Sequence, residues 1–220
     1  MATRNIPFPD KVRDMVLDVI THVRRQEYTP EQLCQLQKII ECKYFYWWCM
    51  DMKKEEYMME LFTDDFRYYL NGHLTVKDKL LQARNAKWCN KDMQTMHMGH
   101  QPMIWLIDEN HARGVFQYED HMCYYDDCEV LQSWMVYCDD FVKGEDGAWR
   151  IQKLRMATAR WTAISAPRWC PGTGCRTRGI RRTTKRSYPE KPHIFVWLLP
   201  RAFIPSSFSQ RYSRRMPLKS

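Results

Sequence analysis

One stretch, residues 95–120, limits the folds open to this chain more than any other. It reads TMHMGHQPMIWLIDENHARGVFQYED, two extended apolar runs joined by a polar connection at residues 108–110. Such a pattern predicts a β-hairpin. The start of the first strand then faces the end of the second, so we expect His97 and Asp120 to be cross-strand neighbours. A carboxylate beside an imidazole suits a general base, although a structural hydrogen bond would explain one such pair equally well.

The rest of the pattern predicts helices first and a long antiparallel sheet afterwards, the order of an α+β protein. Residues 10–26 space their apolar side chains as one helical face. Thr29, Pro30 and Gln32 form a capping box that opens a second helix, which runs through Leu33, Leu36, Ile40 and Tyr44 to Asp51. We therefore predict N-terminal helices packed in a strongly curved antiparallel sheet, a cone-shaped α+β barrel with a pocket in its mouth.

The later elements are predicted from turn signals and alternation. The pattern indicates a helix at 55–62, a strand at 66–70, a helix at 76–83 capped by Thr75, and strands at 95–107, 111–124, 130–143 and 149–161. Three domains are expected: an N-terminal helical extension at 1–28, the main domain at 29–163, and a basic tail of low order at 164–220.

The net charge of +8 is unevenly distributed. Residues 161–220 hold 13 of the 34 Lys and Arg residues and one of the 26 acidic residues, which leaves 21 basic and 25 acidic residues before them. The overall basic character therefore does not support nucleic-acid binding by the main domain. The tail itself has two interpretations, a surface that contacts RNA or an acidic partner, and a disordered extension without a selected role; its loss of periodicity favours the second.

The cysteines and the apolar runs bear on location. Nine cysteines lack the spacing of a disulfide framework, the N-terminus lacks the pattern of a signal peptide, and no apolar run reaches the length of a membrane span. We expect a cytoplasmic protein with reduced thiols and no membrane partner. A zinc site from His97, His100, His121, Cys123 and Cys128 is disfavoured, because their spacing matches no zinc motif and adjacent strand residues point to opposite faces.

Four segments resemble the SnoaL-like members of the nuclear-transport-factor-2-like superfamily, and within it the bile acid 7α-dehydratases. They are Tyr46-Trp-Trp-Cys-Met-Asp51, Phe66-Arg-Tyr-Tyr69-Leu-Asn71-Gly72, Thr95-Met-His97-Met-Gly-His100-Gln-Pro102, and Ala112-Arg-Gly114 running to Tyr118-Glu119-Asp120. The resemblance covers roughly residues 30–161 and none of the tail. It implies a cofactor-free lyase that removes water from a hydroxylated steroid-like or polycyclic enone.

The resemblance also implies roles for individual residues. His97 looks like the general acid/base, and Asp120 looks like the carboxylate that orients it. Tyr46 and Tyr69 look like phenols that bind or polarise the substrate oxygen, and Asp51 looks like a partner that positions the Tyr46 region. From pattern alone, Tyr46 would be core packing, Asp51 a capping or solvated residue, and Tyr69 a solvent-facing residue. The presence of all five matched positions together supports the site.

The last strand departs from the family pattern. The family has an arginine near the end of this strand, whereas Thr158 falls opposite it here and Arg160 lies two residues further on. Two residues preserve the face of a strand, so Arg160 is a candidate substrate-binding residue. The chemistry agrees with these roles, because tyrosine hydroxyls can stabilise the negative charge that forms on a conjugated carbonyl oxygen when a histidine removes the neighbouring proton.

We predict a dehydratase with a small hydrophobic substrate, which can be carried as a thioester, and with neither metal nor other cofactor. The superfamily usually pairs or triples through its sheet, so a homo-oligomer is expected. One alternative is an isomerase or cyclase of polyketide or terpenoid intermediates, which would use the same His–Asp pair without losing water. A non-catalytic ligand-binding module on the same fold is another alternative, although such a module has no need of an acid/base pair.

Overall fold

The structure, a computed structural model, describes residues 2–5, 9–88, 93–124 and 129–165. In chain order, the elements are β1 (Ala2–Asn5), α1 (Asp10–Val23), α2 (Pro30–Met52), α3 (Glu55–Met58), the 3₁₀ helix η1 (Met59–Leu61), β2 (Phe62–Leu70), β3 (His73–Val76), α4 (Lys79–Trp88), β4 (Met93–Leu106), β5 (His111–Tyr124), β6 (Glu129–Lys143) and β7 (Trp149–Ser165). The four long strands match the predicted ones within a few residues.

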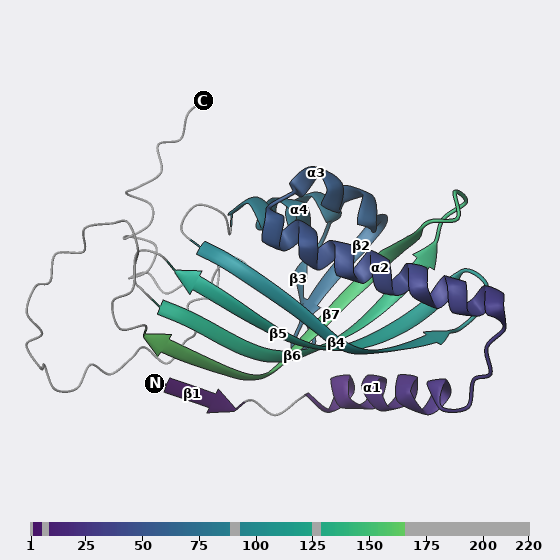
Figure 1. The fold of residues 1–220 in the computed structure, drawn as a ribbon, viewed down its shortest axis with the longest axis horizontal. Coiled ribbons are helices and arrows are strands. Elements are labelled where there is room, and N and C mark those ends of the chain that lie inside the picture. Colours follow the sequence, from purple (N-terminus) through teal and green to yellow (C-terminus); the bar gives the residue numbers. More distant parts are fainter. Residues whose placement is uncertain (1, 6–8, 89–92, 125–128, 166–220) are drawn as a thin grey trace, which may run out of the picture. The chain divides into compact units, whose positions relative to one another are not determined.

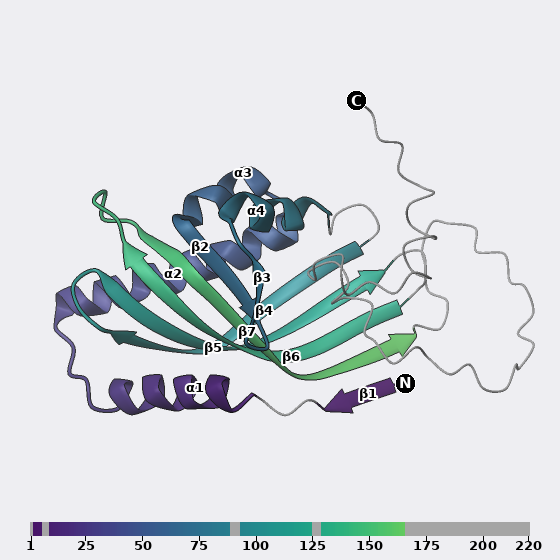
Figure 2. The same ribbon diagram turned by 180° about the vertical axis from the view of Figure 1, so that it is seen from behind.

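The strands form one curled sheet in the order β3-β2-β7-β6-β5-β4, with β1 paired to β7. Neighbouring strands are antiparallel except for β2 and β7, which run parallel. The predicted α+β class with N-terminal helices and a curved sheet is confirmed. Figures 1 and 2 show that α2 crosses the concave face of this sheet, whereas α1 lies along its outer face.

Helix α2 begins as predicted but buries a different face. The Thr29 hydroxyl accepts a hydrogen bond from the Gln32 N–H, and the Gln32 side chain accepts one from the Thr29 N–H, which completes the capping box. Leu33 of the predicted apolar face is exposed, whereas Ile39, Lys43 and Trp47 are buried. Those three residues, spaced four apart, line the side of α2 that faces the sheet.

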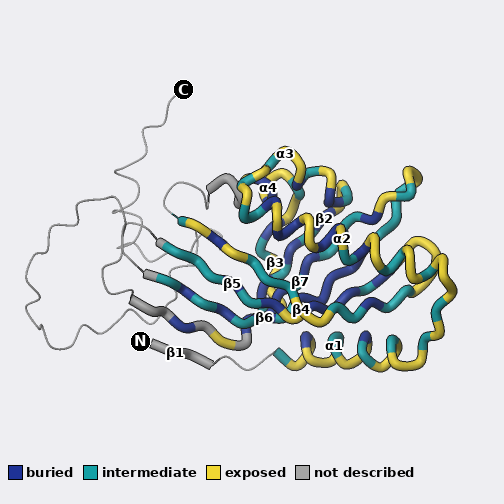
Figure 3. Tube along the Cα trace, viewed as in Figure 1, coloured by how far each residue is buried: buried dark blue, intermediate teal, exposed yellow. Residues whose placement is uncertain are grey.

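Helix α1 has the predicted apolar face, and this face covers the outside of the sheet. Val12 and Val19 are buried, and Val19 packs with Val115 of β5 and Cys138 of β6. Alternating residues of a strand point to opposite faces, so the sheet has one apolar layer beneath α1 and another beneath α2. Figure 3 shows the buried segments concentrated where the sheet meets α2.

The segment before the long strands differs from its prediction. Thr75 lies in β3 rather than capping a helix, and α4 begins at Lys79. Asp78 takes the capping role, because its carboxylate accepts a hydrogen bond from the Leu81 N–H at 2.8 Å. The predicted helix at 55–62 is divided into α3 and η1, and the predicted strand at 66–70 begins earlier, at Phe62.

Some predictions fall largely outside the described residues. Only residues 164 and 165 of the predicted tail are described, as the end of β7, so the nature of the tail and the domain boundaries remain predictions. Within the described ranges, the cysteines at positions 34, 42, 49, 123 and 138 are free thiols. Among the described helices, none has the combination of length and apolar character that crossing a membrane requires.

Candidate active site

The register of the sheet aligns concave side chains in rows across β4, β5, β6 and β7. His97 pairs with Asp120, and Asp120 pairs with Ser133, so these three form one row. The predicted cross-strand neighbourhood of His97 and Asp120 is therefore confirmed. The next row contains residues 99, 118, 135 and 158.

The orienting carboxylate of His97 comes from α2. Asp51 Oδ1 lies 2.5 Å from His97 Nδ1, and Asp51 Oδ2 accepts a hydrogen bond from the His97 backbone N–H at 2.9 Å. The Thr95 hydroxyl donates to Asp51 Oδ1 at 2.8 Å. Both side chains of the pair are mostly shielded, with exposed fractions of 6% for His97 and 17% for Asp51. One carboxylate thus forms hydrogen bonds with both the ring and the backbone N–H of His97.

This contact defines the proton arrangement of the ring. Burial alone would raise the pKa of Asp51, but the hydrogen bonds and charge of His97, together with the hydrogen bond from Thr95, lower it. An ionised carboxylate only accepts hydrogen bonds, so Nδ1 of His97 carries the proton that faces Asp51. Nε2 is then the nitrogen with a lone pair in the neutral ring, the form that a general base needs.

Asp120 has a different environment from the one predicted for an orienting carboxylate. The Tyr118 hydroxyl donates to Asp120 Oδ2 over 3.4 Å, and Ser133 also donates to the carboxyl, whereas Oδ1 has no hydrogen-bond partner. Burial raises the pKa of Asp120, and the nearby His97 only partly offsets this. The orienting contact to His97 comes from Asp51 instead, because the end of α2 reaches Nδ1 from above the sheet.

Four tyrosines surround these groups: Tyr46, Tyr68, Tyr118 and Tyr137. Burial raises the pKa of Tyr68, Tyr118 and Tyr137 well above the ordinary value, and the nearby carboxylates add to this effect. Their phenols therefore stay protonated and can donate hydrogen bonds. The Tyr118 ring lies 5.6 Å from the His97 ring and 5.0 Å from the Tyr137 ring, so the tyrosines form a layer beside the base.

Tyr46 is buried among these tyrosines, and a hydrogen-bond partner comes from α4. The Tyr46 hydroxyl accepts a hydrogen bond from Gln82 of α4 at 3.0 Å. Its ring packs edge-on against Phe62. Asp51, which was expected to position the Tyr46 region, contacts His97 and Thr95 instead, because it lies on the side of α2 that faces β4.

The expectation for Tyr69 is corrected by strand alternation. Tyr69 pairs with Arg155 of β7, whose guanidinium lies 6.0 Å from the Tyr69 ring and pairs with Asp140. Its neighbour Tyr68 is the buried residue, and its hydroxyl lies 3.9 Å from the Met156 sulfur. Adjacent strand residues face opposite ways, so the phenol that enters the interior is Tyr68.

The expectation for Arg160 is corrected by a β-bulge. Trp134 pairs with Arg160, whereas the next residue, Met135, pairs with Thr158, so Ala159 is an extra residue in β7. The extra residue reverses the face on which the following side chains lie. Arg160 is accordingly exposed, and its guanidinium lies 5.2 Å from the Trp134 ring. Thr158, in the family position of the arginine, is fully buried.

Sequence reasoning missed a buried ion pair beneath the tyrosines. Lys43 Nζ of α2 lies 2.6 Å from Asp139 Oδ2 of β6, and both side chains have no exposed surface. The ammonium lies 3.6 Å from the centre of the Tyr137 ring and 4.8 Å from that of Tyr46. Burial lowers the pKa of Lys43 and raises that of Asp139, and their mutual attraction opposes both changes. The only sequence signal was a lysine within the apolar spacing Ile39, Lys43, Trp47.

Sequence reasoning also missed the contact between Trp47 and Gly99. A Cβ atom added at Gly99 would lie 1.8 Å from a carbon of the Trp47 ring. The indole therefore occupies the space above Gly99. Gly99 and His97 lie on the same face of β4, because they are two positions apart in the strand. It also stacks on Tyr118, with ring centres 5.5 Å apart. A glycine in the middle of a predicted strand, two residues after the histidine, was the available signal.

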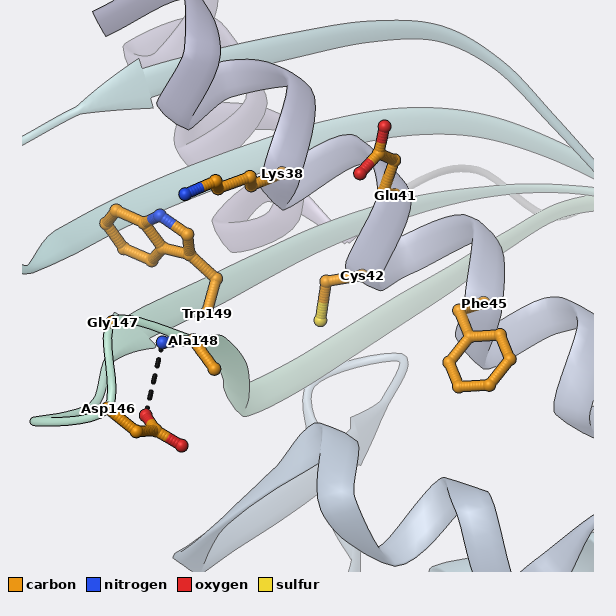
Figure 4. A pocket seen from close by; sticks show the side chains of 8 residues that line it. All are labelled: Lys38, Glu41, Cys42, Phe45, Asp146, Gly147, Ala148 and Trp149. Atoms are coloured by element: carbon orange, nitrogen blue, oxygen red, sulfur yellow. Dashed lines mark hydrogen bonds between the residues drawn. The ribbon is translucent and has the colours of Figure 1, made fainter. Parts of the chain in front are cut away.

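A separate hollow lies between α2 and the turn before β7 (Figure 4). It has a volume of about 570 Å³ and is lined by Lys38, Glu41, Cys42, Phe45, Asp146, Gly147, Ala148 and Trp149. None of the residues around His97 lines it. Within the described ranges, no group of three or more His, Cys, Asp or Glu side chains is arranged to hold a metal ion.

Comparison with known proteins gives a family and a fold. The sequence model of the SnoaL-like domain matches residues 31–155, more than half of the chain. A candidate scytalone dehydratase from Novosphingobium aromaticivorans has a TM-score of 0.54 and 16% identity over 66% of this chain and 96% of its own. Hexachlorocyclohexane dehydrochlorinase LinA-type3 from Novosphingobium barchaimii has a TM-score of 0.55 and 16% identity over 63% and 96%. No curated protein matches the chain.

Proposed function

The chain belongs to the SnoaL-like domain family, and on that premise we propose that it is a cofactor-independent lyase in which His97 removes a proton from carbon. The observation that carries this proposal is the Asp51–His97 pair, with one carboxylate bound to both the ring and the backbone of the histidine. A base fixed in this way loses little free energy to reorientation when the proton is transferred.

The surrounding groups supply what an elimination needs. Proton removal next to a carbonyl places negative charge on the carbonyl oxygen, and phenol donors in a shielded site stabilise that charge. We assign this role to Tyr46 and to Tyr68, the buried phenol of β2, because the Tyr118 hydroxyl already donates to Asp120. The hydrogen bond from Gln82 polarises the Tyr46 hydroxyl and strengthens it as a donor. The protonated His97 can then return its proton to the departing group, which completes loss of water.

The fold neighbours favour elimination over other proton transfers. One is described as a candidate scytalone dehydratase and another as a hexachlorocyclohexane dehydrochlorinase, names that denote loss of water and of hydrogen chloride. We propose dehydration of a hydroxylated steroid-like or polycyclic enone as the reaction. An isomerase or cyclase would use the same base without loss of water from the substrate. A non-catalytic binding module would transfer no proton at all.

Mass spectrometry in heavy water separates these functions. Purified protein is incubated with hydroxylated 3-oxo steroids and other hydroxylated polycyclic enones, as free compounds and as thioesters, with His97→Ala as the control. Loss of one water that disappears in His97→Ala supports the dehydratase. Deuterium uptake without water loss indicates an isomerase or cyclase. If wild type and His97→Ala give the same products, His97 is not the base and the proposal fails.

A further inference from the structure

Helix α2 carries a second apolar row besides the one that packs on the sheet. Five uncharged residues recur every four positions along the helix, and we call them the α2 ridge: Leu36, Ile40, Tyr44, Trp48 and Met52. The first two are half-buried, and the last three are exposed, with fractions of 60% for Trp48 and 57% for Met52. In Figure 3, exposed segments recur along α2 between buried ones. The sheet therefore buries one side of α2 and leaves a large apolar side uncovered.

Neighbouring side chains extend the α2 ridge into a broad patch. Leu33 of α2, Phe45 of α2 and Tyr57 of α3 are also exposed, and the ring centres of Phe45 and Tyr57 lie 6.3 Å apart. A large side chain has about 200 Å² of surface, so these three residues and the α2 ridge together expose roughly 600 Å². This is at the upper end of the apolar patches that monomeric proteins leave in water, and such patches commonly bind another molecule.

The residue types of this patch are those of protein interfaces. Tyrosine, tryptophan, phenylalanine and methionine are enriched at the buried centres of such interfaces, where charged residues are depleted. Tryptophan and tyrosine are also frequent among the residues whose truncation weakens binding most. None of the five residues of the α2 ridge is charged. The patch therefore fits an apolar protein surface better than a polar ligand.

The outer face of the sheet, another broad apolar surface, is already covered over β5 and β6. Val19 of α1 packs there with Val115 and Cys138. Further along α1, the imidazole of His22 stacks on the Trp105 ring of β4, with ring centres 3.8 Å apart. A second copy would have to displace α1 to pair through this part of the sheet. The outer side of α2 can be reached without any rearrangement.

The α2 ridge is suited to pair with a second copy of itself. Two helices whose four-residue rows lie side by side prefer a crossing angle of about −50°. A twofold axis near Tyr44 brings Ile40 of one copy next to Trp48 of the partner subunit, and the same contact recurs on the other side of the axis. Neither contact buries a charged residue of the α2 ridge. One surface thus serves both copies, as a twofold dimer requires.

We propose that the α2 ridge is the interface of a twofold homodimer, in which a second copy of this chain covers Tyr44, Trp48 and Met52. A stable complex buries about 800 Å² on each partner, so the patch supplies most of the area and flanking residues supply the rest. Asp51 lies on the same helix, where it contacts His97. The dimer therefore holds α2 from the side opposite the sheet, whichever reaction the site catalyses.

Sedimentation velocity of the full-length protein over a range of concentrations tests the interface. Wild type should sediment with twice the mass of the chain. Trp48→Glu places a charge at the centre of the patch and should raise the dissociation constant of the dimer roughly 100-fold, the loss expected for a central tryptophan. Leu17→Glu is the matched control, because Leu17 is a similarly exposed residue of α1, and it should leave the mass unchanged. Both side chains are exposed, so circular dichroism should show both variants folded.

Three outcomes of this measurement would overturn the proposal. Wild type that stays monomeric at every concentration would mean that another segment or another protein covers the α2 ridge. A trimer would contradict a twofold contact, which closes with two copies. Equal dissociation of Trp48→Glu and Leu17→Glu, or a dimer that Trp48→Glu leaves intact, would place the interface elsewhere.

A pair of opposite charges tests which residues face each other. Ile40→Glu and Trp48→Lys should each be monomeric alone, because each places a charge against an apolar side chain. Mixed in equal amounts, they should form a heterodimer, since the new carboxylate at position 40 faces the new ammonium at position 48 and the second contact keeps its native residues. Native mass spectrometry identifies this species. Ile40→Glu mixed with Trp48→Glu is the control and should stay monomeric. No heterodimer in the first mixture, or equal pairing in both, would contradict the twofold arrangement.

Discussion

His97 Nδ1 lies 2.5 Å from Asp51 Oδ1, although 46 positions separate the two residues in the chain. They meet because α2 crosses the concave face of the sheet. Residues four positions apart in α2 lie on its sheet-facing side, one at each turn. Trp47 meets Gly99 and Asp51 meets His97 along β4, while Lys43 meets Asp139 on β6. A single helix face therefore supplies a buried cation, a packing ring and the carboxylate that binds His97.

Tyr68 and Tyr69 provide a matched test of which phenol belongs to the site. Tyr68 is buried beside the interior carboxylates, whereas Tyr69 contacts Arg155 on the other face of β2. We expect Tyr68→Phe to lower turnover about 10-fold or more, because it removes a donor next to the reacting groups. Tyr69→Phe should stay within about twofold of wild type. Steady-state kinetics on the substrate that the panel identifies gives both values, and the reverse order would contradict the assigned faces.

Gly99→Ala should destabilise the protein through Trp47. The added methyl would collide with the indole, and such overpacking costs about 1–3 kcal/mol. Thermal unfolding monitored by circular dichroism should show a melting temperature lower by roughly 3–10 °C. Adding Gly99→Ala to Trp47→Leu should cost almost nothing further, because the smaller side chain vacates the space. Equal costs of Gly99→Ala in both backgrounds would mean that the contact is not responsible.

Lys43→Met should leave Asp139 buried without its counter-charge, at a cost of about 3–5 kcal/mol at neutral pH. The double variant Lys43→Met/Asp139→Asn should recover most of this loss, since the Asn oxygen can still accept the hydrogen bond that Asp139 Oδ1 receives from the Arg155 N–H. Chemical denaturation measures the unfolding free energies. A double variant as unstable as Lys43→Met would show that the loss comes from packing.

The same variant should respond to pH in a defined direction. Burial raises the pKa of Asp139 in the folded protein, and without Lys43 nothing of similar strength would lower it. A carboxyl whose folded pKa is raised binds its proton more tightly in the folded state, so stability falls as the pH rises above the unfolded pKa of about 4. We expect the deficit of Lys43→Met relative to wild type to be smallest near pH 4 and to grow toward pH 7. A deficit independent of pH would exclude Asp139 as its cause.

The sequence predicted the elements well where local signals were strong. The capping box at Thr29, the amphipathic spacing of α1 and the alternation of the long strands are local patterns, and the structure confirms them. The hairpin argument also placed His97 opposite Asp120, because register follows from the turn. Alternation was harder to follow near irregularities. The extra residue Ala159 placed Arg160 on the outer face, and a shift of one position exchanged Tyr69 for Tyr68.

The remaining contacts are long-range and have no local signature. The resemblance singled out Asp51, but not its contact with His97, which depends on where α2 crosses the sheet. The Lys43–Asp139 pair joins residues nearly a hundred positions apart, and its polar side chains lie within apolar stretches.

The most direct test of the proposed site asks which carboxylate orients His97. It compares Asp51→Asn with Asp120→Asn in the water-loss assay, on protein shown to be folded by circular dichroism. Among the described carboxylates, Asp51 is the one hydrogen-bonded to the His97 ring, so Asp51→Asn should lower turnover at least 100-fold, the range of a general base that loses its tautomer and position. Asp120→Asn should cost no more than about 10-fold. If Asp120→Asn abolishes water loss while Asp51→Asn retains it, Asp120 is the partner of the base and the role proposed for Asp51 is wrong.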